Sequence, residues 1–137
     1  MNIKRAISIT IIISFVVYLI SVIGSKLLGI DLETANAANM PTAMWYVALI
    51  SVSIISTLGA IWYFRSSKIV PNIKNGLLLG LIFSIFGFIV SIILLLIQEN
   101  GGDIILSYFA QVEFWMAFIL IITTSSLVGY IRSKEKK

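Results

Sequence analysis

Apolar residues fall in four long stretches of this chain, and the short segments between them and at the two ends carry nearly all of the charge. The stretches cover about residues 6–24, 43–64, 76–97 and 107–131. A helix needs roughly 20 apolar residues, at about 1.5 Å each, to cross a hydrocarbon core of about 30 Å. Strands rarely reach this length, although the stretches are rich in β-branched residues. The pattern therefore predicts four membrane-spanning helices.

The segments between the four stretches are short, so each helix should pack antiparallel against the next one in the chain. We expect an all-α membrane protein in which residues 1–137 form a single transmembrane domain, an up-down-up-down antiparallel bundle of four transmembrane helices. The composition agrees with this prediction. Hydrophobic residues make up 59% of the chain and charged residues 12%, against about 45–50% and about 25% in soluble domains.

The basic residues are sorted by side of the predicted membrane. Lys26 lies on the side that also carries Asp31, Glu33, Glu99 and Asp103. The remaining basic residues lie on the other side: Lys4, Arg5, Arg65, Lys68, Lys74, Arg132, Lys134, Lys136 and Lys137. Basic residues in short loops favour the cytoplasm. We therefore expect a multi-pass protein of the plasma membrane with both termini cytoplasmic, whose net charge of +4 requires no nucleic acid partner.

A different reading of the N-terminal region stays open at this point. Lys4 and Arg5, the first apolar stretch and the segment Ala35–Asn36–Ala37 together imitate a secretory signal with its cleavage site. Cleavage there would leave three spans and place the N-terminus outside. The apolar stretch is longer than a typical signal core of about 7–15 residues, and the segment lies well beyond its end. We therefore prefer four spans.

Small residues recur along the third apolar stretch at helical spacing, and they are Gly76, Gly80, Ser84, Gly87 and Ser91. This spacing places all five on one stripe of a helix. In lipid, small residues let two helix backbones approach closely, and van der Waals packing then drives their association. We interpret the stripe as a helix-packing surface, with a narrow pathway as the less common alternative.

The absence of cysteine and histidine restricts the chemistry that the chain can perform. It removes thiolate nucleophiles, disulfides and nearly all zinc chemistry, and it removes the commonest acid–base side chain. No catalytic residue, metal ligand or cofactor-binding residue is predicted. We expect a protein that is not an enzyme and that needs no cofactor.

Glu113 is the one acidic residue inside a predicted span, near the start of the fourth. A carboxylate within the membrane suggests function, because burying its charge costs a few kcal/mol. Counting back from Tyr130 places Glu113 about one turn below the outer surface, where water, Lys26, Gln111 or Gln98 would satisfy it. Glu113, Gln111 and Gln98 are therefore the candidate ionisable or pathway residues at the external mouth.

Two functional hypotheses follow, from different classes. The first is a non-enzymatic subunit that acts by packing, either as a homo-oligomer or as an accessory subunit of a larger membrane complex, with the lipid bilayer as its solvent. The small-residue stripe favours it. The alternative is a small transporter or channel that uses Glu113 near the external mouth.

Overall fold

The computed structural model describes residues 2–29, 42–66, 69–96, 107 and 109–135. Within these residues the chain is helical, with α1 at Ile3–Leu27, α2 at Thr42–Phe64, α3 at Ile73–Leu96 and α5 at Val112–Glu135. All four of these helices are long and apolar enough to cross a membrane. The prediction of an all-helical protein with four helices of this kind is confirmed. The Ala35–Asn36–Ala37 segment lies outside the described residues.

Local sequence signals determine several helix ends. The Asn2 side chain accepts a hydrogen bond from the backbone N–H of Arg5 at the start of α1, and Asn72 does the same for Asn75 at the start of α3. Both are typical N-terminal caps. Gly29 follows the end of α1 with a φ of 66°, a left-handed conformation that favours glycine.

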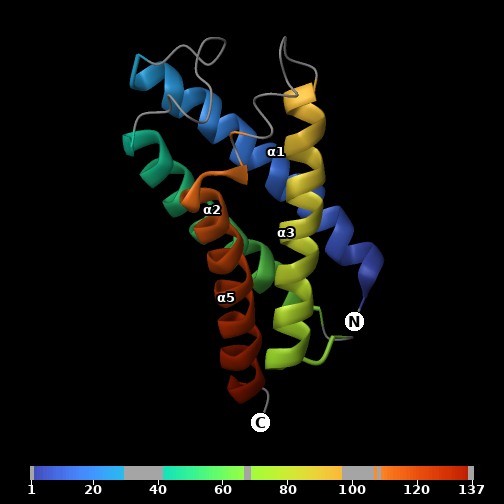
Figure 1. The fold of residues 1–137 in the computed structure, drawn as a ribbon. Helices are drawn as coiled ribbons and strands as arrows, with labels where there is room; N and C mark the ends of the chain where they lie inside the picture. The colour runs from blue at the N-terminus through green and yellow to red at the C-terminus, as the bar shows by residue number, and fades with distance from the viewer. Residues whose placement is uncertain (1, 30–41, 67–68, 97–106, 108, 136–137) are drawn as a thin grey trace.

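The four helices form a bundle in which α3 lies between α1 and α5, and α2 also lies between α1 and α5 (Figure 1). The closest packing joins α3 to α5. Within the described residues α1 makes no contact with α5, and α2 makes only slight contact with α3. The expectation that consecutive helices are neighbours therefore fails for α2 and α3. Their short connection joins helices that lie diagonally across the bundle, because α5 takes the place beside α3.

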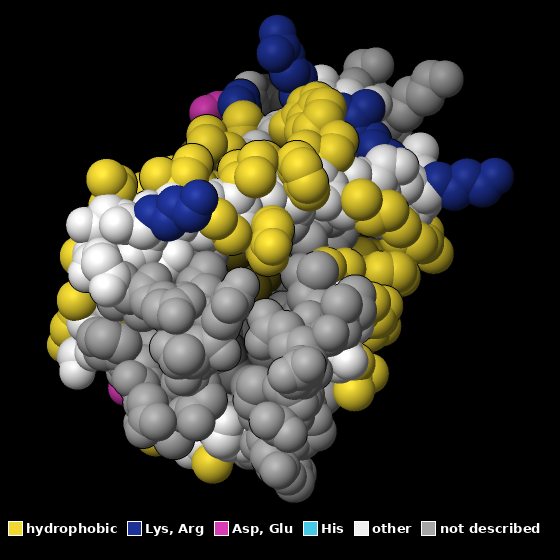
Figure 2. Space-filling model, turned by 90° about the horizontal axis from the view of Figure 1, so that it is seen from above, with side chains coloured by type: hydrophobic (Ala, Val, Ile, Leu, Met, Phe, Trp, Pro, Cys, Tyr) yellow, Lys and Arg dark blue, Asp and Glu magenta, His cyan; other side chains and the backbone are white. Residues whose placement is uncertain are grey.

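One end of the bundle holds the hydrophobic core, and we call it the core end. It is the end where α1 and α3 begin and α2 and α5 end, the lower end in Figure 1. The buried cluster there draws on all four of these helices and on the α2–α3 connection: Ala6, Ile9, Ala60, Tyr63, Phe64, Ile69, Leu79, Phe83 and Val128. The outward faces carry many large apolar side chains, and Figure 2 shows hydrophobic groups over much of the described surface on the face in view.

Two hydrogen bonds fasten the start of α1 to the end of α2 at the core end. The backbone N–H of Asn2 donates to the Tyr63 hydroxyl at 2.9 Å, and the Arg5 guanidinium donates to the Trp62 carbonyl at 2.8 Å. The last carbonyls of a helix have no partner within the helix, so Arg5 satisfies one of them. These contacts hold the start of α1 against the end of α2.

Candidate functional site

The end of the bundle opposite the core is formed around aromatic rings, and we call it the aromatic end. It is the end where α1 and α3 end and α2 and α5 begin. Phe88, Phe109 and Phe114 contact one another there, with ring centroids 5.1–5.7 Å apart in edge-to-face arrangements. Trp115 extends the cluster from Phe114 to Phe118. Aromatic pairs of this geometry stabilise beyond the area that they bury.

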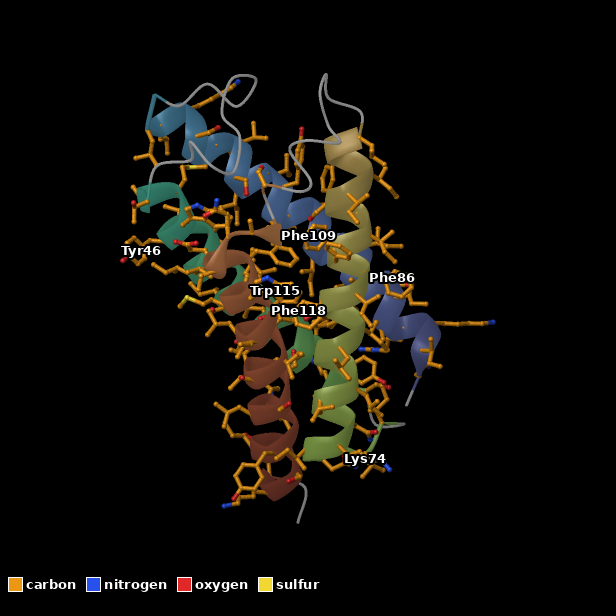
Figure 3. All side chains as sticks on the ribbon, viewed as in Figure 1. Tyr46, Lys74, Phe86, Phe109, Trp115 and Phe118 are labelled. Carbon is orange, nitrogen blue, oxygen red and sulfur yellow. The ribbon has the colours of Figure 1, made fainter. Side chains whose placement is uncertain are left out.

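The segment that precedes α5 folds back against the helix at the aromatic end. The indole N–H of Trp115 donates to the Phe109 carbonyl at 3.0 Å, which ties this segment to the first turns of α5. In Figure 3, Phe109, Trp115 and Phe118 gather near the start of α5, whereas Phe86 lies on the other side of α3. Helix α5 itself begins at Val112, inside the predicted span of about 107–131.

The register between α3 and α5 determines the depth of Glu113. Gly80 faces Ile122 near the middle of the pair, and Phe88 faces Phe114 nearer the aromatic end. In this antiparallel register Glu113 lies at the level of Ile89. Because α3 continues as an apolar helix to Leu96, α5 begins about two turns, roughly 10 Å, short of the end of α3. Glu113 therefore lies about two turns short of the end of α3.

Glu113 lies in the first turn of α5 and is partly buried. The first N–H groups of a helix and its dipole stabilise a carboxylate at this position, by about 0.3–1 kcal/mol at exposed sites. Gln111 is also partly buried, just before the helix. Within the described part of the chain, no hydrogen bond or ion pair joins Glu113 to Gln111 or Lys26. Gln98 lies outside the described residues.

The stripe of small residues on α3 divides into two parts. A Cβ added to Gly76 would lie 2.5 Å from the Ser125 carbonyl oxygen, and one added to Gly80 would lie 2.7 Å from the Cα of Ile122. These two glycines therefore bring the α3 backbone against α5. Ser84 is buried beyond them. A Cβ on Gly87 would meet the Ser14 hydroxyl of α1 only at 4.0 Å, and Ser91 is exposed. Close packing is thus limited to the core-end part of the stripe.

Gly129 completes the close contact from the side of α5, and the sequence analysis did not single it out. A Cβ on this residue would lie 2.5 Å from the Asn72 carbonyl oxygen and 3.1 Å from the Cα of Gly76. Gly129 follows Ser125 by four residues, and both are buried. That small-residue spacing is the signal that would have identified it.

Hydroxyl groups within the helices mostly bond to their own backbone. Thr10 and Ser53, for example, donate to the carbonyls of Ala6 and Leu49. Ser56 and Thr124 form a hydrogen bond between α2 and α5 at 3.0 Å. Within the described residues, the buried hydroxyls of Ser84 and Ser125 have no hydrogen-bond partner. Among the residues that the structure describes, these hydroxyl groups therefore do not form a connected series across the interior.

The described residues contain no group of three or more histidine, cysteine, aspartate or glutamate side chains that could hold a metal ion. Comparison of the chain with protein-family models, with curated proteins and with solved structures gives no match. Function is therefore argued from the geometry of the bundle alone.

Proposed function

We propose that this chain is a multi-pass protein of the plasma membrane, an up-down-up-down bundle of four transmembrane helices with both termini in the cytoplasm. The length and hydropathy of the four helices support membrane insertion. The basic residues at the ends of the helices support the orientation. Lys4 lies in the first turn of α1, Arg65 follows α2, and Lys74 lies in the first turn of α3, all at the core end. Basic residues of this kind favour the cytoplasmic side.

Within that membrane the chain acts by packing against another membrane-embedded helix, as an oligomer or as an accessory subunit, and not by catalysis or conduction. The core end carries this proposal. Fully buried Tyr63, Phe64 and Leu79 fill the centre of the bundle there, with side chains from every described helix around them. A pathway across the membrane would have to pass through this apolar core.

The faces that remain for association are on the outside of the bundle. The closest glycine contacts of α3 are used within the chain, against α5. Outward-facing residues near the middle of the spans include Phe15 on α1, which is 63% exposed, and Ile119 on α5, which is 62% exposed. Their described residues make no contact with each other, so these two helices offer separate surfaces to a partner.

Cysteine cross-linking in native membranes tests association directly, because the chain has no cysteine of its own. Phe15→Cys and Ile119→Cys place a thiol on each outward face, and Leu79→Cys, which is buried, is the matched control. We expect an adduct of one defined mass from one outward face and none from Leu79→Cys. If the adducts of both Phe15→Cys and Ile119→Cys disappear when the protein is diluted with lipid, they arise from random collision, and the proposal is refuted.

The position of Glu113 favours a second candidate, a small transporter with its site at the aromatic end. An acidic group about 10 Å within the apolar length of a neighbouring helix is expensive, and such groups often serve transport. Ion and proton flux into proteoliposomes separates the candidates, with Glu113→Gln compared against Glu135→Gln, an exposed acid at the core end. Packing predicts no flux above empty vesicles. Flux that Glu113→Gln abolishes and Glu135→Gln preserves would establish transport instead.

A further inference from the structure

The core end carries basic side chains that the fold does not use. Arg5 donates to the Trp62 carbonyl, Arg132 pairs with Glu135 at 2.7 Å, and Lys134 lies over the Tyr130 ring. Arg65 and Lys74 are different, because both are exposed and neither has a hydrogen-bond or ion-pair partner among the described residues. Lys74 extends from the lower end of α3 in Figure 3. The first turn of a helix disfavours a cation, so α3 itself gives no reason for a lysine there.

The described residues 69–72 of the α2–α3 connection pack against the bundle between these two basic residues. Ile69 and Pro71 of the connection are buried, and Ile69 belongs to the core cluster. The Asn75 side chain donates to the Val70 carbonyl at 2.8 Å, and its backbone N–H donates to the Asn72 side chain at 2.7 Å. Ile69 thus anchors the described part of the connection in the core, Asn75 ties that part to the start of α3, and Arg65 and Lys74 flank it in the sequence.

Two apolar residues that lie between Arg65 and Lys74 in the sequence are exposed. Val70 is 71% exposed and Ile73 is 60% exposed, although their neighbours Ile69 and Pro71 are buried. A surface with exposed apolar side chains flanked by basic groups suits the boundary between lipid headgroups and acyl chains. Among the described residues, the acid at this end, Glu135, is already paired with Arg132. The surface is therefore positively charged and uncompensated.

We infer that this surface, formed by Arg65, Val70, Ile73 and Lys74, binds the headgroup of an anionic phospholipid in the cytoplasmic leaflet. Arg65 and Lys74 would contact the lipid phosphate from the two ends of the connection, and Val70 and Ile73 would lie against the upper acyl chains. Charge complementarity selects the occupant, since anionic lipids are enriched in that leaflet and attract basic residues beside a span. The inference rests on the proposed membrane insertion and adds a lipid partner to it.

Fluorescence quenching by brominated lipids tests the inference, because Trp62 is partly exposed close to Arg65. The full chain, with Trp45 and Trp115 replaced by phenylalanine, is reconstituted in phosphatidylcholine vesicles that contain brominated phosphatidylglycerol or brominated phosphatidylcholine. We expect phosphatidylglycerol to quench Trp62 at the lower mole fraction. Arg65→Gln and Lys74→Gln should each reduce this preference about fivefold, and salt should weaken it. Lys26→Gln, at the opposite end, should leave it unchanged.

The outcomes separate the inference from the membrane proposal. Quenching of Trp62 by both lipids to the same extent would preserve insertion and overturn the lipid site. A loss of preference in Lys26→Gln as large as in Lys74→Gln would also overturn it, because total charge would then explain the effect. Quenching by neither lipid would refute insertion itself. Phosphatidylglycerol retained by the unsubstituted chain in native mass spectrometry, in excess over phosphatidylcholine, gives a second readout that needs no tryptophan replacement.

Discussion

The two ends of the bundle are built differently. At the core end, large side chains are fully buried, and glycines on α3 and α5 bring two backbones into contact. Toward the aromatic end burial is sparser: α1 has no buried residue from Ile11 to Gly24, and α3 has none among its described side chains beyond Ser84. Met44 and Trp45 at the start of α2 are buried there, and aromatic rings cluster around the start of α5. Regions with few buried contacts open at lower free energy, so we expect stability to reside at the core end and any functional movement at the aromatic end.

Removing one large aromatic side chain from each end gives the largest contrast. Phe83 is 3% exposed in the core cluster, and Phe114 is a partly buried member of the aromatic cluster. We expect Phe83→Ala to lower the free energy of unfolding by about 2–4 kcal/mol, because it leaves a cavity. Phe114→Ala should cost about 1–2 kcal/mol, mainly through lost ring contacts. Unfolding in mixed micelles of increasing SDS content measures both.

Equal losses for Phe83→Ala and Phe114→Ala would show that stability is spread evenly along the bundle. The conservative variants Phe83→Leu and Phe114→Leu control for the loss of apolar volume. If contacts between aromatic rings stabilise this end beyond the apolar volume that they fill, Phe114→Leu should still lower the free energy of unfolding although most of the volume is kept.

A methyl group added to α3 should change the free energy of unfolding in opposite directions at the two ends of the bundle. At Gly76 the new Cβ would meet the backbone of Ser125 and Ser126, which cannot move without shifting α5. We expect Gly76→Ala to cost about 1–3 kcal/mol, the usual range for overpacking. At Gly87 the nearest atom would be 4.0 Å away, so Gly87→Ala should be neutral or stabilising by up to about 1 kcal/mol, as alanine favours helix. Heat treatment followed by size-exclusion chromatography ranks the two, and a tolerated Gly76→Ala would contradict the close α3–α5 contact.

The sequence contains enough information for the number and type of helices, because length and hydropathy alone decide whether a segment can cross a bilayer. It does not contain the order of the helices around the bundle. A short connection was expected to make α2 and α3 neighbours, but the contact of Gly76, Gly80 and Gly129 places α5 beside α3 instead. The helix that packs against a glycine stripe is determined by the sequences of both helices. The periodicity of one apolar stretch describes only one of the two.

The depth of Glu113 shows a similar limit. Counting residues back from Tyr130 assumes that each helix begins at the membrane surface, and it placed Glu113 about one turn inside. The register between α3 and α5 lies outside such a count: α5 begins about two turns short of the end of α3, where Phe88 pairs with Phe114. The aromatic cluster was equally hidden, since Phe88 and Phe109 lie on different apolar segments and come together only through that register.

The smallest expected effect concerns the hydrogen bond between Ser56 and Thr124, which joins α2 to α5 nearer the core end. Both hydroxyls also bond to carbonyls of their own helices, so losing the contact between helices leaves neither group unsatisfied. A double-mutant cycle with Ser56→Ala and Thr124→Val should therefore give a coupling energy near 0.6 kcal/mol, the average for such bonds in membrane proteins. Ser53→Ala, whose hydroxyl bonds only within α2, is the matched control and should show no coupling to Thr124→Val. A coupling above about 1.7 kcal/mol, the highest found for such bonds, would mean that polar contacts contribute to the core end as much as its buried aromatic and glycine residues do.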